Sequence, residues 1–509
     1  MDPKFSIMNP HAPERRWNQS RSPCTMTSPF CVLATAILFA LSGFGAAKDS
    51  SSLLPSSGAR HGSSHGSNKH AYATMLYMGT PRDHEFYIAA RVMLQTLLRF
   101  QVDADLVVIA SRDLPRSWVQ TLESEKVKVV SVDNIPNPYR RQANFDPRFL
   151  STLNKLYAWS LVDYERVVML DADNIFLRNT DELFQCGQFC AVFINPCIFH
   201  TGLFVLEPSE ATFKSLVAGL VTKENEDGAD QGYLMANFDD LLQRPLFLPP
   251  ANGSKLDGFY RLPLGYQMDA SYFYLKLRWN VPCGPNSVIT FPSMPWLKPW
   301  YWWSWPVLPL GLQWHEQRRS AIGYTAEFPA LVLEAIFYFG TMIIALFVKK
   351  KIWQQAEKSQ PGRFCPNRSG CVDCTLFVVG MRFIAIIGCF ILPAILIPKT
   401  VHPFMGWSLE LLAAFSLLVV IISMGNLPVL PVLTPWFGLI GALVMMVLPV
   451  YGNGITRALA IGTYAFLASP FLWWAFKEIL SYLSSRETSN RGWTIIRSES
   501  PASETMKMC

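Results

Sequence analysis

Charged residues are scarce in this sequence. Asp, Glu, Lys and Arg make up 16% of the 509 residues, whereas hydrophobic residues make up 50%. This balance is unusual for a soluble enzyme and indicates membrane segments. The net charge is +6, but the basic residues are scattered and form no stripe that alternates with aromatic residues. The composition therefore argues against a nucleic-acid partner.

The N-terminal part has little that could build a folded core. Residues 1–29 are polar and basic, which predicts a cytosolic tail. The apolar run at 30–47 is long for a signal-peptide core and short for a membrane span, and Gly45-Ala46-Ala47 could be a cleavage site. A retained signal-anchor and a cleaved signal peptide both remain open. Residues 48–70, rich in Ser, Gly and His, predict a flexible stem in the lumen.

Residues 71–300 have the pattern of a globular α/β domain. We expect strands at 71–78, 105–110, 127–132 and 166–170, and helices at 85–100 and 153–162. Strands that alternate with helices predict a mainly parallel sheet with helices on both faces.

The last third of the chain is strongly apolar. Five apolar stretches, at about 328–348, 375–397, 407–424, 428–451 and 457–476, predict five transmembrane helices within 328–476. Three lysines, Lys349–Lys351, follow the first stretch and place that end in the cytosol by the positive-inside rule. The domain before it is then lumenal, and the tail at 477–509 is cytosolic.

A tryptophan-rich segment lies between the globular part and the first predicted span. Because Trp and Tyr favour the membrane–water interface, we expect residues 301–327 to form an interfacial collar. An aromatic core is the alternative interpretation.

Two carboxylates, Asp171 and Asp173, directly follow the predicted buried strand at 166–170. Ligand sites in open α/β sheets lie at the carboxyl ends of strands. Carboxylates spaced in this way can hold one hard divalent cation, which would neutralise charge on a leaving diphosphate. An isolated Asp-x-Asp is a weak signal, but its place at a strand end strengthens it.

Several motifs in this region occur in a characteristic order. They are Asn154-Lys155-Leu156, Asp171-Ala172-Asp173 with Asn179-Thr180-Asp181-Glu182-Leu183-Phe184 after it, His200-Thr201-Gly202-Leu203-Phe204-Val205, Gly228-Ala229-Asp230-Gln231-Gly232 and Lys298-Pro299-Trp300. By these motifs residues 71–300 resemble the glycogenin-like retaining glycosyltransferases of family eight. The resemblance implies a GT-A type nucleotide-sugar domain, which is Rossmann-like, followed here by an α-helical multi-span membrane domain.

The resemblance also implies roles for individual residues. Asp171 and Asp173 are the expected ligands of Mn²⁺ or another divalent cation, and Lys155, Asp230 and Gln231 are the expected catalytic residues. The residues expected to bind the UDP-sugar donor are Met78, Tyr87, Ala172, His200, Thr201, Gly202 and Lys298.

The sequence departs from the family pattern in two places. His200-Thr201-Gly202 stands where the family has Asn-Ser-Gly, which puts an imidazole near the donor sugar. Thr290 stands where the family has its third metal ligand, a histidine. Water, the diphosphate, His200 and His315 are the open alternatives for completing the metal shell.

A narrower resemblance rests on the aromatic segment and the five spans. Together they resemble the plant glucuronosyltransferases that act on inositol phosphorylceramide, which implies UDP-glucuronate as donor, a sphingolipid acceptor and a multi-pass location in the Golgi membrane. A xylan-type glucuronosyltransferase and a catalytically weak membrane scaffold are the alternatives.

Cysteines and one glycosylation motif complete the sequence features. Pairing among Cys186, Cys190, Cys197 and Cys283 is left open, and Cys365, Cys371 and Cys374 are expected to be ordinary or palmitoylated cytosolic cysteines. Asn252-Gly253-Ser254 is a sequon on the predicted lumenal side.

Overall fold

The computed structural model describes residues 69–498 apart from 144, 196, 226, 276–285, 292–293, 295–296, 306–309, 359–371, 426 and 448–453. The expected tail at 1–29, the apolar run at 30–47 and nearly all of the stem at 48–70 lie outside the described residues. So do Cys283, Cys365 and Cys371.

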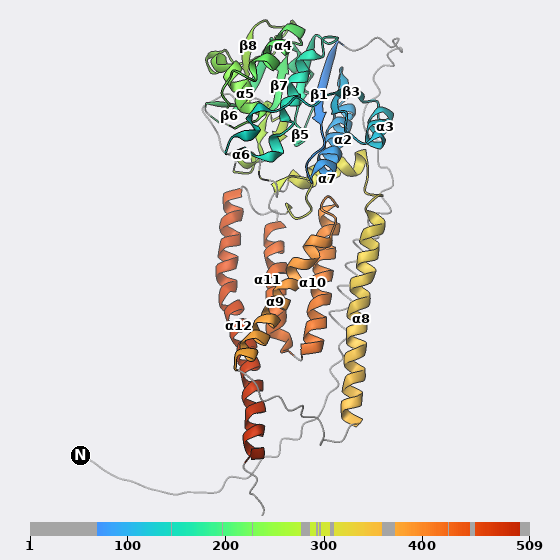
Figure 1. Ribbon diagram of the computed structural model, residues 1–509, viewed down its shortest axis with the longest axis vertical. Helices are drawn as coiled ribbons and strands as arrows, with labels where there is room; N and C mark the ends of the chain where they lie inside the picture. Colours follow the sequence, from blue (N-terminus) through green and yellow to red (C-terminus); the bar gives the residue numbers. More distant parts are fainter. Residues whose placement is uncertain are drawn as a thin grey trace, which may run out of the picture. The chain divides into compact units, whose positions relative to one another are not determined.

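The part of the chain before the apolar helices is built on a seven-stranded sheet in the order β3-β2-β1-β4-β7-β6-β8 (Figure 1). Its strands are β1 (His70–Leu76), β2 (Asp105–Ser111), β3 (Lys128–Val132), β4 (Arg166–Leu170), β6 (Phe189–Asn195), β7 (Ile198–Leu206) and β8 (Phe259–Leu262). All neighbours pair in parallel except β7, which is antiparallel to β4 and to β6. A three-stranded sheet holds β5 (Asn174–Phe176), β10 (Val288–Thr290) and β9 (Met268–Asp269) in that order.

Helices cover both faces of the large sheet. The helices of this part are α2 (Asp83–Arg99), α3 (Arg116–Ser124), α4 (Glu210–Gly219), α5 (Asp230–Asn237), α6 (Ala270–Leu275) and α7 (Leu310–Ala321). The 3-10 helices are η1 (Pro138–Arg141), η2 (Pro147–Phe149), η3 (Thr152–Ser160), η4 (Asp181–Gln185), η5 (Asp239–Gln243) and η6 (Leu264–Tyr266). Alternate strand residues belong to two separate cores: Tyr72 and Val168 pack with α2, whereas Ala73 and Val167 pack with η3, α4 and α5. The predicted α/β class, mainly parallel with helices on both faces, is confirmed.

The helix expected at 153–162 is a 3-10 helix, η3, and its sequence explains why. Leu153, Leu156 and Trp159 recur every three residues and are all buried in one core. A 3-10 helix has three residues per turn, so these side chains share one face. Thr152 and Lys155 share a neighbouring face for the same reason.

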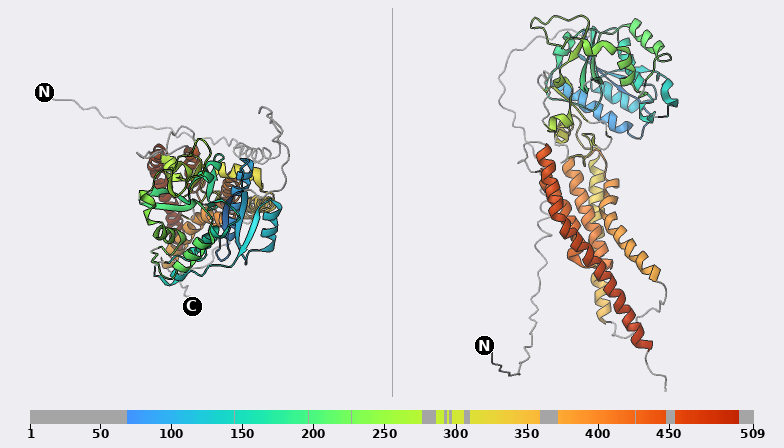
Figure 2. Two further views of the ribbon diagram at one scale, coloured as in Figure 1. Left: turned by 90° about the horizontal axis from the view of Figure 1, so that it is seen from above. Right: turned by 90° about the vertical axis from the view of Figure 1, so that its left-hand side faces the viewer.

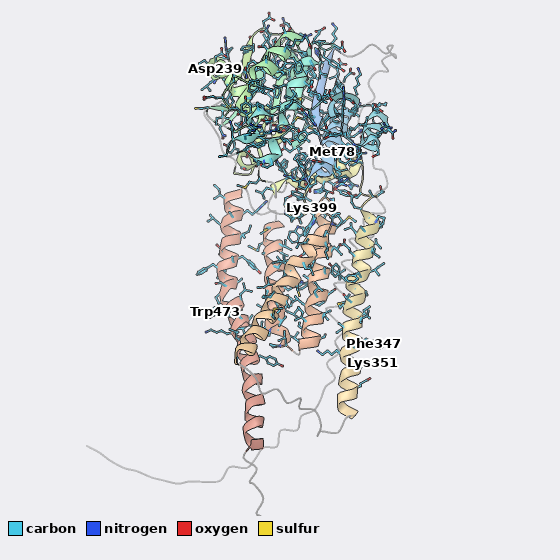
Figure 3. The ribbon with its side chains drawn as sticks, in the orientation of Figure 1. Met78, Asp239, Phe347, Lys351, Lys399 and Trp473 are labelled. Carbon is cyan, nitrogen blue, oxygen red and sulfur yellow. A yellow bond between two sulfur atoms is a disulfide. The ribbon has the colours of Figure 1, made fainter. Side chains whose placement is uncertain are left out.

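Five long apolar helices follow: α8 (Phe328–Lys358), α9 (Val372–Leu396), α10 (Pro403–Gly425), α11 (Val429–Val447) and α12 (Gly454–Ser498) (Figures 1 and 2). In the described residues four of them, α8, α10, α11 and α12, are long and apolar enough to cross a membrane, and α9 contributes a shorter apolar part, Ile384–Leu396. Large side chains on them are exposed, among them Leu333 at 69% and Ile395 at 71%. Lys351 lies towards the end of α8 (Figure 3).

The tryptophans of the expected interfacial collar, 301–327, are turned inward where the structure describes them. Trp302 is 1% exposed and Trp314 is 1% exposed. The ring of Trp302 meets that of Trp407 edge-on at 5.1 Å, and the Trp407 indole N–H donates to the carbonyl of Trp305 at 2.7 Å. Trp302 and Trp305 thus pack against the start of α10, whereas Trp314 packs against Trp300.

Gly406 makes this packing close. A Cβ at Gly406 would lie 2.4 Å from the Trp302 ring, whereas a Cβ at Gly340 on α8 would meet nothing within 4 Å. Alanine is preferred over glycine in helices by about 1 kcal/mol, but overpacking costs about 1–3 kcal/mol. We therefore expect Gly406→Ala to lower the melting temperature of the purified protein and Gly340→Ala to leave it unchanged or raise it. Equal melting temperatures for the two variants would contradict the packing described here.

Candidate active site

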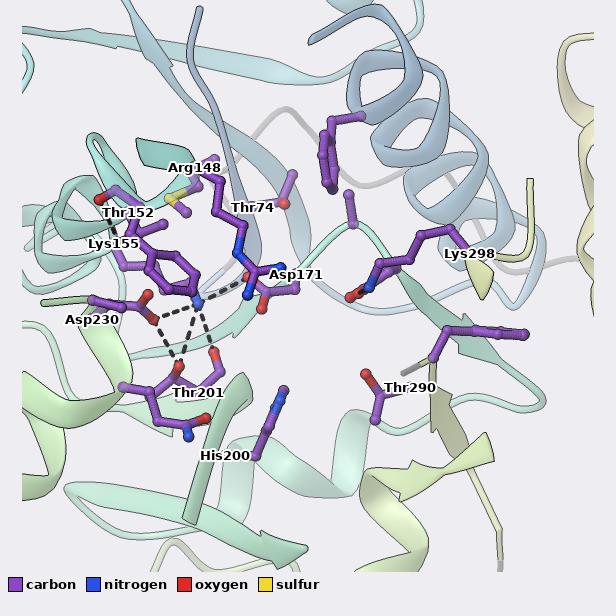
Figure 4. Close-up of a pocket in the computed structure, with 18 of the residues that line it drawn as sticks. Thr74, Arg148, Thr152, Lys155, Asp171, His200, Thr201, Asp230, Thr290 and Lys298 are labelled. Atoms are coloured by element: carbon purple, nitrogen blue, oxygen red, sulfur yellow. Dashed lines mark hydrogen bonds and ion pairs between the residues drawn. The ribbon is translucent and has the colours of Figure 1, made fainter. Parts of the chain in front are cut away.

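A pocket opens at the carboxyl ends of the parallel strands, where α/β sheets bind ligands. Segments after β1 and β4, the first half of β7, the start of α5 and the end of β10 all contribute to it (Figure 4). The residues that line it include Thr74, Tyr77, Arg148, Thr152, Lys155, Asp171, Ala172, Asp173, His200, Thr201, Asp227, Asp230, Gln231, Asp269, Thr290 and Lys298.

Backbone contacts with β7 fix the Asp171-Ala172-Asp173 turn. Leu170 at the end of β4 pairs with Leu203, so the turn continues beside Gly202. The N–H of Asp171 donates to the Gly202 carbonyl at 2.8 Å. The Asn174 amide donates to the same carbonyl at 2.7 Å and to the Asp171 carbonyl at 3.0 Å. The turn is thereby held with its two carboxylates at the pocket.

Lys155 connects several residues on one side of the pocket. This lysine is 2% exposed, and its Nζ lies 2.9 Å from Asp171 Oδ1 and 2.6 Å from Asp230 Oδ2 (Figure 4). It also donates to the Thr201 carbonyl at 3.0 Å, and the Thr201 hydroxyl donates to Asp230 Oδ2 at 2.7 Å. Although burial opposes the charged form, the two carboxylates raise the pKa of Lys155 above its usual value, so it remains an ammonium.

Lys298 occupies the other side and pairs with Asp173. Burial opposes ionisation of Asp173, but the charge and hydrogen bond of Lys298 outweigh it and lower the pKa of that carboxyl. Desolvation, with the nearby charges of Asp173 and Asp230, raises the pKa of Asp171 to about 6 despite Lys155. Three carboxylates thus face two ammonium groups at these lysines, in a pocket whose lining also includes Asp83, Asp227, Asp269, Arg82 and Arg148.

His200 and Thr290 lie below Lys155 and Lys298 in the view of Figure 4. The Nδ1 atom of His200 receives the Gly202 N–H at 2.9 Å and lies 2.9 Å from the Gln267 amide nitrogen. Burial lowers the pKa of His200, so its ring is neutral near pH 7. The Thr290 hydroxyl is buried and has no hydrogen-bond partner in the described part of the chain.

The structure brings most of the predicted site residues together. Lys155, Asp171, Ala172, Asp173, His200, Thr201, Asp230, Gln231 and Lys298 all line the pocket. Three others lie outside the lining residues: Met78 packs at the edge of the core (labelled in Figure 3), Tyr87 stacks on Trp118 at 4.3 Å, and Gly202 supports His200 from behind.

His315, one alternative for the third metal ligand, does not reach the pocket. It is fully buried, and its ring packs against Trp314, Tyr324 and His402. The pocket lining does not include it, so of the two histidines considered for the third ligand only His200 lines the pocket.

Sequence reasoning missed the residues that hold the site in place. Asn174 follows the Asp171–Asp173 turn directly, and an asparagine after a strand end is a signal for such a bond. Thr74 donates its hydroxyl to the Leu170 carbonyl at 2.8 Å, which ties β1 to the end of β4. Gln267 lies far from His200 in sequence, and no local pattern indicates their contact.

The double contact of Lys155 predicts a large effect of its removal. Lys155→Met leaves the buried Asp230 and the half-buried Asp171 without their shared cation, and loss of one partner of a buried ion pair costs up to about 3–5 kcal/mol. We expect a clear drop in melting temperature, and partial recovery when Asp230→Asn is added, since one of the two carboxylates is then neutral. Lys214→Met is the matched control, because Lys214 pairs with Glu210 on the surface and should melt like the unmodified protein. If Lys155→Met melted at the same temperature as Lys214→Met, the bridging role of Lys155 would be contradicted.

Comparison with known protein families agrees with both parts of the chain. A family model described as "PGSIP7 C-terminal domain" matches residues 326–491, and one described as "Mannosyltransferase putative" matches residues 105–191.

Individual relatives cover more of the chain. It is 58% identical over 421 residues to "Putative glucuronosyltransferase PGSIP8" of Arabidopsis thaliana, covering 82% of this chain and 83% of that protein. It is 31% identical over 258 residues to "Inositol phosphorylceramide glucuronosyltransferase 1" of the same plant, covering 50% of this chain and 46% of that protein. It is 33% identical over 180 residues to "Glycogenin-1" of Caenorhabditis elegans, covering 35% of this chain and 39% of that protein. The chain therefore belongs to the glycogenin-like glycosyltransferase family, and it is a glycosyltransferase.

Proposed function

We propose that this glycosyltransferase moves glucuronate from UDP-glucuronate onto inositol phosphorylceramide, with retention at the anomeric carbon. The observation that carries the proposal is the convergence of Lys155, Lys298 and three carboxylates in one pocket at the strand ends. The choice of donor and acceptor is supported by relatives named as glucuronosyltransferases, one of which acts on inositol phosphorylceramide.

Lys155 and Lys298 suit the diphosphate of such a donor. Both are buried to within 5% of complete burial, and they approach the pocket from opposite sides. A lysine ammonium is a point charge that pairs with phosphate oxygens from many directions. The two lysines would hold the diphosphate and stabilise the charge that grows on it as the sugar leaves.

A divalent cation such as Mn²⁺ fits the remaining groups. Asp173 Oδ1 and the Thr290 hydroxyl are buried without a hydrogen-bond partner in the described residues, and both belong to pocket-lining side chains. Oxygen atoms of this kind are the ligands that hard cations prefer. Asp171 and Asp173 would hold the ion, with Thr290 on the same pocket wall. A bound cation supplies charge neutralisation at the leaving diphosphate.

Asp230 and Gln231 begin α5 and face the same pocket. Lys155 and the Thr201 hydroxyl hold the Asp230 carboxylate in one orientation. As the bond between the anomeric carbon and the diphosphate breaks, positive charge grows on the sugar ring, and a fixed carboxylate stabilises it without having to reorganise. We assign Asp230 this role and Gln231 the contact beside it.

The apolar helices favour a lipid acceptor. A soluble acceptor can diffuse to any exposed pocket, whereas a lipid headgroup stays at the membrane surface. Helices long and apolar enough to span a bilayer, joined directly to the catalytic part, would keep the pocket close to such a headgroup. A polysaccharide acceptor is not held in the membrane, so it would not require a catalytic part joined to several spans. The presence of the pocket lysines and carboxylates argues against an inactive scaffold.

The proposed function is tested with the full-length protein in lipid vesicles. With UDP-glucuronate and Mn²⁺ we expect labelled glucuronate to appear on inositol phosphorylceramide and not on xylan oligosaccharides. Asp171→Ala and Asp173→Ala should each lower transfer by about 100-fold or more, because each removes charge compensation at the diphosphate. Asp163→Ala, at an exposed position outside the pocket, is the control. Transfer to xylan alone, or near-normal activity of both variants in EDTA, would refute the proposal.

We further propose that the catalytic part faces the Golgi lumen. The disulfide between Cys186 and Cys190 suits an oxidising compartment. The three lysines Lys349–Lys351, towards the end of α8, suit the cytosolic side.

Three sequons test this orientation within one chain. Asn252 is exposed and would lie in the lumen, whereas Asn18 and Asn367 would lie in the cytosol. We expect a single N-glycan. Asn252→Gln should remove it, whereas Ser254→Thr keeps the sequon and should retain the glycan. Protease added to sealed vesicles should cut between α8 and α9 and spare 71–300. Glycans on Asn18 or Asn367, or cleavage within 71–300, would show that the chain has the opposite orientation to the one proposed.

A further inference from the structure

The imidazole of His200 is held in one tautomer by its neighbours. The Gly202 N–H points at His200 Nδ1 from 2.9 Å. A backbone N–H can only donate, so Nδ1 must carry the lone pair and cannot carry a proton. A protonated ring would place two N–H groups against each other, which excludes the imidazolium in this geometry.

Gln267 reinforces the same state. Its amide nitrogen lies 2.9 Å from Nδ1 of His200, and its side chain is completely buried. Since Nδ1 is already fixed as an acceptor, the amide must present its N–H₂ group to the ring. The opposite oxygen of Gln267 is buried without a partner in the described residues, which is the cost of this orientation.

Gly202 is required for the close approach of these groups. A Cβ at this position would lie 2.4 Å from the Gln267 amide nitrogen and 2.7 Å from the His200 ring. The third residue of the His200-Thr201-Gly202 motif thus leaves room for the contact that fixes the first.

A proton therefore sits on Nε2, the other nitrogen of the neutral ring. Within the described part of the chain Nε2 has no hydrogen-bond partner, and the side chain of His200 points into the pocket between Thr201 and Thr290 (Figure 4). A protonated nitrogen has no lone pair for a metal, so this state is incompatible with His200 as the third metal ligand. It is a fixed donor that needs an acceptor.

We propose that His200 selects the donor sugar: its Nε2–H donates to the carboxylate of a uronate, and Gly202 and Gln267 hold the ring in the tautomer that does so. This inference rests on the proposed use of a UDP-uronate. A carboxylate accepts hydrogen bonds on both oxygens and donates none, so it is the sugar substituent that best matches a donor-only group.

The test compares three probes on the full-length protein with Mn²⁺: UDP, UDP-glucose and UDP-glucuronate. His200→Asn should lower the affinity for UDP-glucuronate relative to UDP-glucose by about tenfold, as expected for loss of a hydrogen bond to a charged group. The affinities for UDP and for Mn²⁺ should not change. Gln267→Met, which keeps the length and removes the amide, should move the same ratio in the same direction by less. His84→Asn is the control, because His84 packs beside Tyr87 and Trp118 outside the pocket lining.

A second readout reports the tautomer directly. The chain has 8 histidines, so ¹⁵N-histidine labelling with His200→Asn as the assignment control identifies the ring signals. We expect an unprotonated Nδ1 and a protonated Nε2, and Gln267→Met should weaken that preference.

Each contrary outcome has a distinct meaning. Lower Mn²⁺ affinity in His200→Asn would make the ring a metal ligand, and lower UDP affinity would place it on the diphosphate; either overturns the inference. An unchanged sugar ratio, or a protonated Nδ1, also overturns it. If the unmodified protein binds no UDP-glucuronate, the proposed donor is wrong. If it prefers UDP-glucuronate and His200→Asn keeps that preference, the proposed donor stands and only the role of His200 is wrong.

Discussion

The ammonium group of Lys155 is the interaction on which the site depends. It draws together the turn after β4, the first residue of α5 and the carbonyl of Thr201 on β7, which are distant in sequence. Removing three charges from water is costly, and their attraction compensates only when the geometry is good and further hydrogen bonds are made. The three-residue period of η3 meets this condition, because it directs Lys155 to the pocket while Leu156 and Trp159 enter the core.

Lys298 and the proposed cation use different oxygens of the Asp173 carboxylate. Asp173 is paired with Lys298 in the protein alone, and the same carboxylate is a proposed ligand of the cation. Lys298 binds Oδ2, whereas Oδ1 is buried without a hydrogen-bond partner in the described residues, so a cation would bind Oδ1 while the ion pair with Lys298 persists. Lys155 has two carboxylate partners, so the loss of one would leave it anchored by the other. The buried charges are therefore set before the donor arrives, which reduces the reorganisation required during reaction.

The sequence predicted this arrangement where an apolar strand pattern is followed directly by residues of the right chemistry. The strand at 166–170 is short and wholly apolar in its interior, so the two aspartates after it had to lie at a sheet edge. The ordered motifs then indicated which distant residues join them, and Lys155, Asp230 and Lys298 do so. Met78 and Tyr87 were assigned by resemblance alone, and neither lines the pocket. The contact of Gln267 with His200 depends on the position of η6 beside β7 in the folded chain. No local sequence pattern predicts that position.

The tryptophans show the limit of composition more clearly. A tryptophan is amphipathic, so a cluster of them beside apolar helices fits both a membrane interface and a buried core. The deciding factor is whether a partner surface exists, and Gly406 provides one for Trp302. Glu85 on α2 then joins the parts, since it accepts from the Trp300 indole at 3.3 Å and lies 3.7 Å from the Lys399 ammonium just before α10. Trp300 is two residues after Lys298 and packs against Phe86 and Trp314, whereas Trp302, two residues further on, packs against Gly406 and Trp407 at the start of α10. The segment that carries Lys298 is thus joined within a few residues to the packing surface on α10, and changes at this surface should be felt at Lys298.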